Sequence, residues 1–219
     1  MNGNPQEAAS VKTYGLALHT ASPELGLAIS NFAGDSRCQT WNLGRDLATD
    51  LHQHLVEFMQ PQIWADLAFI AVAKGPGGFT GTRMGVVTAR TLAQQLDIPV
   101  FAISTLAAVA CDSNQKSPSN QDIALQMRAQ RGQLFGAVYS VNKDSGLTEL
   151  FPDTVMTPES WEEKLENWGN SYQLIEVESE LGSSVSSVLE LAYLEWQRGN
   201  RPNWSEALPY YGQHPVQEK

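Results

Sequence analysis

The stretch AKGPGGFTGTRMG at residues 73–85 has the composition best suited to chemistry, because five of its thirteen residues are glycine. It follows an apolar run and opens an amphipathic one, so its backbone N–H groups could bind an anion at the start of a helix. It is not a Walker A loop, and it departs from G-x-G-x-x-G at Thr80. Alternatively, the glycines let a helix pack closely on a sheet. Both interpretations stay open here. The residues of the candidate vestigial nucleotide or anion loop are Gly75, Gly77, Gly78, Thr80 and Gly81.

Nucleophilic and metal chemistry find little support elsewhere in the chain. Ser104 and Cys111 are available nucleophiles, but no motif places a histidine and a carboxylate around either. His52 and His54 are two residues apart on an expected helix, so they point to different faces and would not share a metal. We therefore predict neither a catalytic residue nor a metal site.

The first half of the chain predicts a three-strand meander that leads into buried strands joined by helices. Leu47, Leu51, Leu55 and Phe58 recur at helical spacing, whereas DLAFIAVAK is apolar throughout, as in a parallel strand buried on both faces. This order is that of the ribonuclease H-like core, the repeating unit of the actin-like ATPase fold. The expected strands are residues 13–21, 25–31, 37–43, 66–74 and 97–104, and the expected helices are residues 45–59 and 80–96.

The second half resembles a reduced copy of the first, with a hairpin at residues 122–141, a third strand, a helix after Thr157, a strand and a final amphipathic helix. The predicted fold is α/β, with two ribonuclease H-like lobes in an actin-like (sugar kinase/Hsp70) arrangement and an abbreviated second lobe. The polar residues 111–121 predict a loop at the boundary. The predicted domains are a disordered tail at 1–12, a first lobe with partner-binding helices at 13–111, and a smaller lobe at 122–219.

His19 bears on an alternative function, that of a catalytically active actin-like ATP-dependent phosphotransferase. Such enzymes need an acidic residue at the end of the first strand to hold the metal and phosphate. An imidazole cannot replace a carboxylate on Mg²⁺, which prefers oxygen ligands. The sequence therefore argues against a self-sufficient kinase or ATPase.

Two helices carry more apolar surface than one sheet contact requires. Helix 80–96 has one face of small residues and a second stripe of Met84, Val87 and Thr91, with Val86 nearby; helix 45–59 also has two stripes. This pattern predicts a helical interface with another chain, and burial under the second lobe is the alternative. The predicted interface residues are Leu51, Leu55, Met59, Arg83, Met84, Val86, Val87 and Thr91.

Charge and cysteine content restrict the partners and the compartment. The 219-residue chain has a formal net charge of −10, and its few basic residues are scattered, which disfavours direct, tight binding to nucleic acid. The two cysteines form no framework, and the polar start has no signal-peptide layout, so we predict a cytoplasmic protein with reduced thiols and no membrane contact.

The block AVAKGPGGFTGTRMGVVTARTLAQQLDIPVFAISTLAAVA resembles the signature of the TsaB family, also called YeaZ, which usually reads G-P-G-S-F-T-G-x-R-x-G and ends in S-T-L-x-A. MRAQRGQLFGAVY resembles the family's D-A-R-x-G-E-V-Y hairpin, and ALPYYGQHP its P-x-Y-x-R tail. The chain departs from the pattern at His19, Gly78, Gln133 and Gly212, where the family usually has Asp, Ser, Glu and Arg.

The resemblance implies a non-catalytic subunit that pairs, through helices of its first lobe, with the TsaD-type catalytic subunit. With a TsaE-type ATPase, that complex transfers a threonylcarbamoyl group to an adenosine beside the tRNA anticodon. The resemblance also implies a homodimer in isolation, contact with tRNA only through the complex, and no cofactor of its own, with ATP and metal on the partner subunits. The family's older description as a peptidase finds no supporting triad or metal motif in this sequence.

Overall fold

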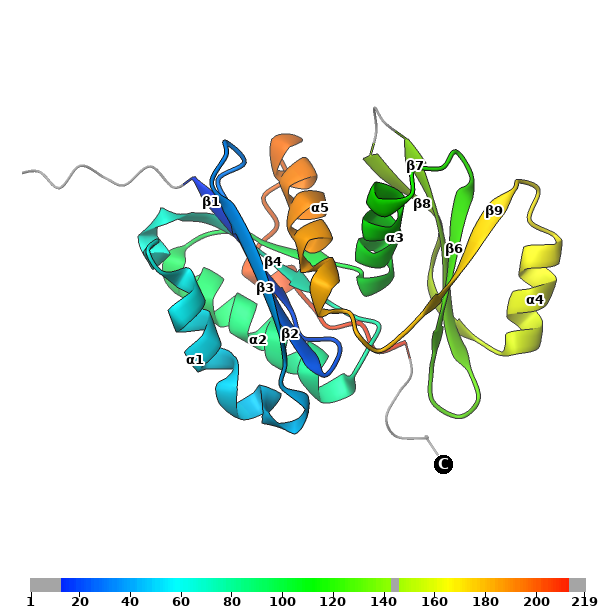
Figure 1. Cartoon of the computed structure of the whole chain (residues 1–219), viewed down its shortest axis with the longest axis horizontal. Coiled ribbons are helices and arrows are strands. Elements are labelled where there is room, and N and C mark those ends of the chain that lie inside the picture. The colour runs from blue at the N-terminus through cyan, green and yellow to red at the C-terminus, as the bar shows by residue number, and fades with distance from the viewer. Residues whose placement is uncertain (1–12, 143–145, 213–219) are drawn as a thin grey trace, which may run out of the picture.

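The computed structural model describes residues 13–142 and 146–212 of the chain. The disordered tail that we expected at residues 1–12 lies outside the described residues. Figure 1 shows two sheets side by side, with helices on both faces of the first. The lobes are named here by their sheets, each with the helices packed on it.

The first sheet has the strand order β3-β2-β1-β4-β5. The first three strands pair antiparallel, whereas β4 and β5 join β1 in parallel. The meander and the two parallel strands are therefore confirmed. The strands are β1 (Tyr14–His19), β2 (Glu24–Ser30), β3 (Ser36–Asn42), β4 (Leu67–Ala73) and β5 (Val100–Ile103).

The helices α1 (Leu47–Met59) and α2 (Phe79–Leu96) cover one face of the first sheet (Figure 1). The helix α5 (Val185–Gln197) covers the other face, where its Val185 and Val188 pack near Ala17 and Phe69. Short 3₁₀ turns precede α1 at Gly44–Asp46, β4 at Trp64–Asp66 and α5 at Gly182–Ser184, and another spans Trp204–Glu206.

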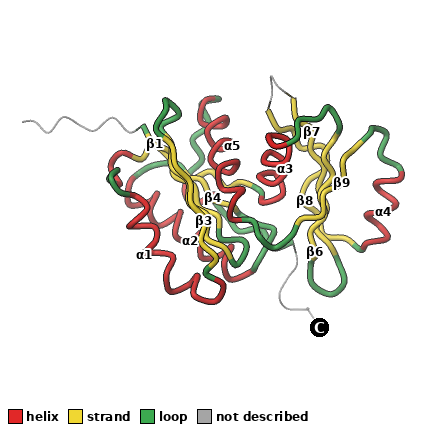
Figure 2. Tube along the Cα trace, viewed as in Figure 1, coloured by secondary structure: helices red, strands yellow, loops and turns green. Residues whose placement is uncertain are grey.

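The second sheet repeats the strand pattern of the first without a fifth strand. Its order is β8-β7-β6-β9, with an antiparallel meander and one parallel strand, so it matches β3-β2-β1-β4 element for element. The predicted α/β fold of two such lobes, the second abbreviated, is therefore confirmed (Figure 2). The elements are β6 (Asp122–Arg128), β7 (Leu134–Asn142), β8 (Gly146–Met156), α4 (Pro158–Glu166) and β9 (Tyr172–Val177).

The helix α3 (Thr105–Lys116) corrects the first part of the loop that we expected at residues 111–121, whereas residues 117–121 do form a loop. Ser104 caps the start of α3, and Leu106 and Ala110 pack with strands of the second sheet. Because this apolar surface is buried, the helix continues to Lys116 through residues that look polar in sequence.

The division of the chain into domains at residues 111–121 stays a prediction. The structure does place α5, which comes from the range 122–219, against the first sheet rather than the second. Within the described part of the chain, every helix is too short or too polar to span a bilayer.

Candidate functional site

The groove between α1 and α2 is the apolar surface feature that corresponds to the predicted interface. It has a volume of about 320 Å³. Val56 from α1 and Val87 from α2 are 55% and 58% exposed beside it, which is unusual for large apolar side chains in neighbouring helices. The groove residues are His52, Leu55, Val56, Trp64, Met84, Val87, Thr88, Thr91 and Leu92.

Four of the eight predicted interface residues lie on the outside of α2. Arg83, Val87 and Thr91 are exposed, and Met84 is half-buried at the groove. The guanidinium of Arg83 lies 5.5 Å from the ring centre of Phe79, at the start of the same helix. These four side chains are available to a partner, and the interface itself stays a prediction.

The other four predicted interface residues are a correction, because they lie in the hydrophobic core of the first lobe. Leu51 and Val86 are fully buried, and Leu55 and Met59 are almost so. The row Leu51–Leu55 faces the sheet, and a partner could not reach Leu51, Met59 or Val86 without opening the core. Of the four, only Leu55 also borders the groove.

Sequence reasoning did not identify Trp64 and Thr88 as part of this surface. Trp64 follows the turn after α1, and helical spacing cannot place a residue beyond the end of its helix. Thr88 lies on α2, but it is largely buried and looks like part of the sheet-facing side.

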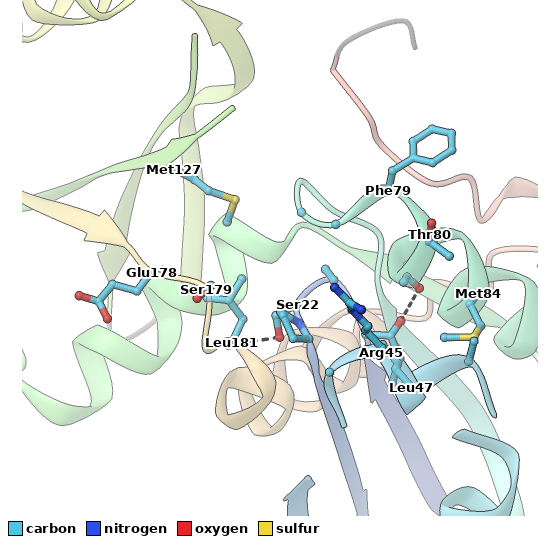
Figure 3. Close-up of a pocket in the computed structure, with 18 of the residues that line it drawn as sticks. Ser22, Arg45, Leu47, Phe79, Thr80, Met84, Met127, Glu178, Ser179 and Leu181 are labelled. Carbon is cyan, nitrogen blue, oxygen red and sulfur yellow. Dashed lines mark hydrogen bonds between the residues drawn. The ribbon is translucent and has the colours of Figure 1, made fainter. Parts of the chain in front are cut away.

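A second cavity, the interlobe cleft, has a volume of about 860 Å³. Figure 3 shows Thr80, Phe79 and Arg45 of the first lobe on one side and Met127 and Glu178 of the second on the other. Four of the five candidate anion-loop residues line this cleft, namely Gly77, Gly78, Thr80 and Gly81. Gly75 is absent from its lining residues and instead contacts the C-terminal segment, where a Cβ on it would lie 2.4 Å from the carbonyl oxygen of Tyr210.

Close packing explains why three residues of the glycine stretch are glycine, so the close-packing interpretation is confirmed at these three positions. A Cβ on Gly77 would lie 2.2 Å from the carbonyl oxygen of Ala21, and one on Gly81 would lie 2.1 Å from that of Thr20. A Cβ on Gly85 would meet Thr20 Oγ1 at 2.2 Å. The glycine stretch therefore lets α2 lie directly against the turn that follows β1. Anion binding by this loop stays a prediction.

His19 ends β1 inside the molecule and has no exposed surface. Burial lowers its pKa to about 4, so the imidazole is neutral at pH 7. Neither ring nitrogen has a hydrogen-bond partner among the described residues. The side chain is thus a buried neutral group at the end of β1.

The surroundings of the two candidate nucleophiles, Ser104 and Cys111, explain both residues without a catalytic role. Ser104 Oγ accepts a hydrogen bond from the N–H of Ala107 and caps α3. Burial, with the nearby charge of Glu190, raises the pKa of the Cys111 thiol, so this cysteine is a weak nucleophile at neutral pH. The described residues hold no group of three or more His, Cys, Asp or Glu side chains arranged for a metal ion.

Comparison with protein families matches residues 59–184 to the model described as TsaD: tRNA N6-adenosine threonylcarbamoyltransferase. Among curated proteins, the chain is 39% identical over 107 residues to the tRNA threonylcarbamoyladenosine biosynthesis protein TsaB of Bacillus subtilis (strain 168), covering 49% of this chain and 44% of that protein. It is 28% identical over 101 residues to TsaB of Escherichia coli (strain K12), covering 46% and 43% respectively. The chain spans about half the length of the curated relatives it matches.

Among solved structures, the chain is similar to YeaZ from Pseudomonas aeruginosa, with a TM-score of 0.75 and 21% sequence identity over 90% of this chain and all of that one. A second structure, described as an uncharacterized protein with similarity to peptidase YEAZ from the same organism, has a TM-score of 0.77 and 21% identity over 92% of this chain. At this identity the likeness shows the fold alone.

Proposed function

The chain belongs to the TsaB (YeaZ) family, which is related to TsaD, and on this premise we propose that it is a non-catalytic subunit in the formation of threonylcarbamoyladenosine in tRNA. Its role is to pair with the TsaD-type catalytic subunit through α1 and α2. The relatives' names connect the family to this modification, and the apolar groove supports a role in pairing.

The observation that carries the proposal is the exposure of Val56 and Val87 on either side of one groove. A helix of the partner that fills the groove would remove both side chains from water, and apolar burial of this kind drives association. In the absence of the TsaD-type subunit, the same surface on a second copy is the natural partner, which gives a homodimer.

The charge of the chain supports an indirect relation to tRNA. A net charge of −10 repels the phosphate backbone, so we propose that tRNA is bound only through the complex. The acidic surface also favours partners with basic surfaces. We place the protein in the cytoplasm with this complex and without membrane contact.

The catalytic chemistry is assigned to the partners. The buried, neutral imidazole of His19 is a poor site for Mg²⁺ and phosphate. We therefore propose that ATP and metal belong to the TsaD-type and TsaE-type subunits and that this chain has no cofactor of its own.

Co-purification tests the proposal. The tagged chain should retain the TsaD-type protein of the same organism at stoichiometric amounts, and removal of either from the reconstituted reaction should abolish the modification. Failure to retain that protein would contradict the pairing role. Turnover of ATP by the chain alone with Mg²⁺, if lost in His19→Ala, would instead favour the phosphotransferase alternative.

A further inference from the structure

Residues 207–212, here called the strap, begin in the first lobe. Ala207 is buried in the core that lies under α1 and α2. The N–H of Tyr210 donates a hydrogen bond of 2.7 Å to the carbonyl oxygen of Lys74, at the end of β4. Gly75 has no side chain to obstruct this contact, and its φ of +100° is one that glycine adopts readily. The strap is thus hydrogen-bonded to Lys74, the residue directly before the first glycine of the glycine stretch.

The same tyrosine reaches the second lobe with its side chain. Tyr210 Oη donates a hydrogen bond of 2.6 Å to the backbone carbonyl oxygen of Asp153 in β8. Its ring meets Phe135 of β7 at 6.4 Å between centres. One residue therefore joins both sheets, and in Figure 1 the red end of the chain passes from the first lobe toward the second.

The last residue of the strap, Gly212, packs closely against the second lobe. Gly212 has a φ of +61°, and a Cβ on it would lie 2.6 Å from Val155 Cγ2 and 2.7 Å from the ring of Phe135. The glycine lets the strap lie directly on β7 and β8.

Asp153, the residue of the second lobe that Tyr210 contacts, is itself held in place by a hydrogen bond. Tyr139 is 2% exposed and donates a hydrogen bond of 3.0 Å to Asp153 Oδ1. Its hydroxyl also lies 3.4 Å from Ser104 Oγ, which caps α3. The strap therefore contacts, through Tyr210, a residue (Asp153) that Tyr139 connects to the start of α3, the helix between the two sheets.

The strap also touches α2. The ring of Tyr211 packs against that of Phe79, the first residue of α2, with 4.6 Å between the ring centres. We propose that the strap is a clamp that holds the second lobe at a fixed position relative to the glycine stretch and the start of α2. The clamp thereby sets the width of the interlobe cleft, whose walls are the glycine stretch and residues such as Met127 and Arg128.

This inference goes beyond the proposed function and does not depend on it. Its test measures the separation of the lobes in the full chain. Spin labels go on native Cys38, exposed on β3, and on Leu174→Cys, at a 45% exposed position on β9, in a Cys111→Ala background. The distance distribution between the labels should broaden in Tyr210→Ala. Tyr14→Phe is the control, because it also removes a hydrogen bond from a tyrosine to an aspartate, in this case the exposed Asp35. In this control the distance distribution should stay narrow.

Tyr210→Phe keeps the ring and removes only the hydrogen bond to Asp153, so it serves if Tyr210→Ala does not fold. In this variant, amide hydrogen exchange should become about fivefold faster at residues 74–79 and at residues 153–156 together, as expected for the loss of one hydrogen bond. A distance distribution unchanged in Tyr210→Ala would overturn the proposal. So would faster exchange confined to residues 207–212, or faster by the same factor along the whole chain.

Discussion

Thr20 donates a hydrogen bond from its Oγ1 to the carbonyl oxygen of Gly81 over 2.8 Å. The bond joins the turn after β1 to the first turn of α2, and it forms because Gly81 brings the helix backbone within reach of the turn. The bond holds the start of α2 in place, and the buried face of Val86, Ala89 and Ala93 holds the rest of the helix against the first sheet.

We expect Gly81→Ala to destabilise the protein by up to about 2 kcal/mol, because overpacking of this kind costs about 1–3 kcal/mol. Alanine gains about 1 kcal/mol over glycine in helix propensity. That gain is smaller than the cost of a Cβ placed 2.1 Å from the carbonyl oxygen of Thr20, because a backbone atom cannot move aside easily. Urea denaturation measures the change. Gly169→Ala is the control, since its Cβ would meet nothing within 4 Å. Equal stability of the two variants would show that the close contact does not govern packing.

Gly78→Ser should have the opposite effect and stabilise the protein by about 0.5–1 kcal/mol. Gly78 is the N-cap of α2 and has no side chain that could accept a hydrogen bond from the N–H groups at the start of the helix. Its φ and ψ are −62° and 122°, values that serine adopts without strain. A Cβ there would meet only Ala21 O, at 3.6 Å. A rise in the urea midpoint checks this. Gly77→Ser, one residue earlier, should lower the midpoint, and the prediction fails if both substitutions act alike.

Val87→Asp tests the groove. The side chain is 58% exposed, so the variant should fold with an unchanged circular dichroism spectrum. In a complex the new carboxylate would be buried without a partner, so affinity for a second copy or for the TsaD-type subunit should fall on the order of a thousandfold. Sedimentation velocity and co-purification measure the two associations.

Leu174→Asp is the matched control for Val87→Asp, because it changes an exposed apolar side chain on the other lobe and should leave both associations intact. Unchanged pairing by Val87→Asp would place the interface elsewhere. Unfolding by Val87→Asp would show that the side chain belongs to the core.

His19 should make the stability of the protein depend on pH below neutrality. Its pKa is about 4 in the folded protein and about 6.5 when unfolded, so between these values the unfolded chain binds the extra proton. The contribution of His19 is therefore fully present above about pH 6.5 and falls as the pH decreases, by about 3 kcal/mol at pH 4.

The measurement for His19 is the free energy of unfolding at several pH values between 7.5 and 4.5, in the natural chain and in His19→Leu. The variant should lose less stability across this range than the natural chain. Parallel pH curves for the natural chain and His19→Leu would mean that the imidazole is not buried in its neutral form.

Sequence alone determined most of the elements and their order, with the end of α3 as the exception. The apolar run at residues 67–73, the helical spacing in α1 and α2 and the cap at Thr157 are local signals, and each element they predicted is present. Because a meander followed by parallel strands can close in few ways, this order was sufficient to predict the two sheets. The block at residues 71–110 also carried the family signature, and three of its glycines, Gly77, Gly81 and Gly85, lie where a Cβ would clash with the turn after β1.

Only the tertiary structure decided which apolar residues are exposed on the surface and which are buried in the core. Periodicity shows that Leu51 and Leu55 share a face of α1, but not that this face meets the sheet while Val56 stays exposed. The position of α5 on the first sheet and the junction of Tyr210 with Asp153 were equally hidden. These contacts join residues far apart in the chain, and their geometry follows from how whole elements pack. No pattern of neighbouring residues encodes it.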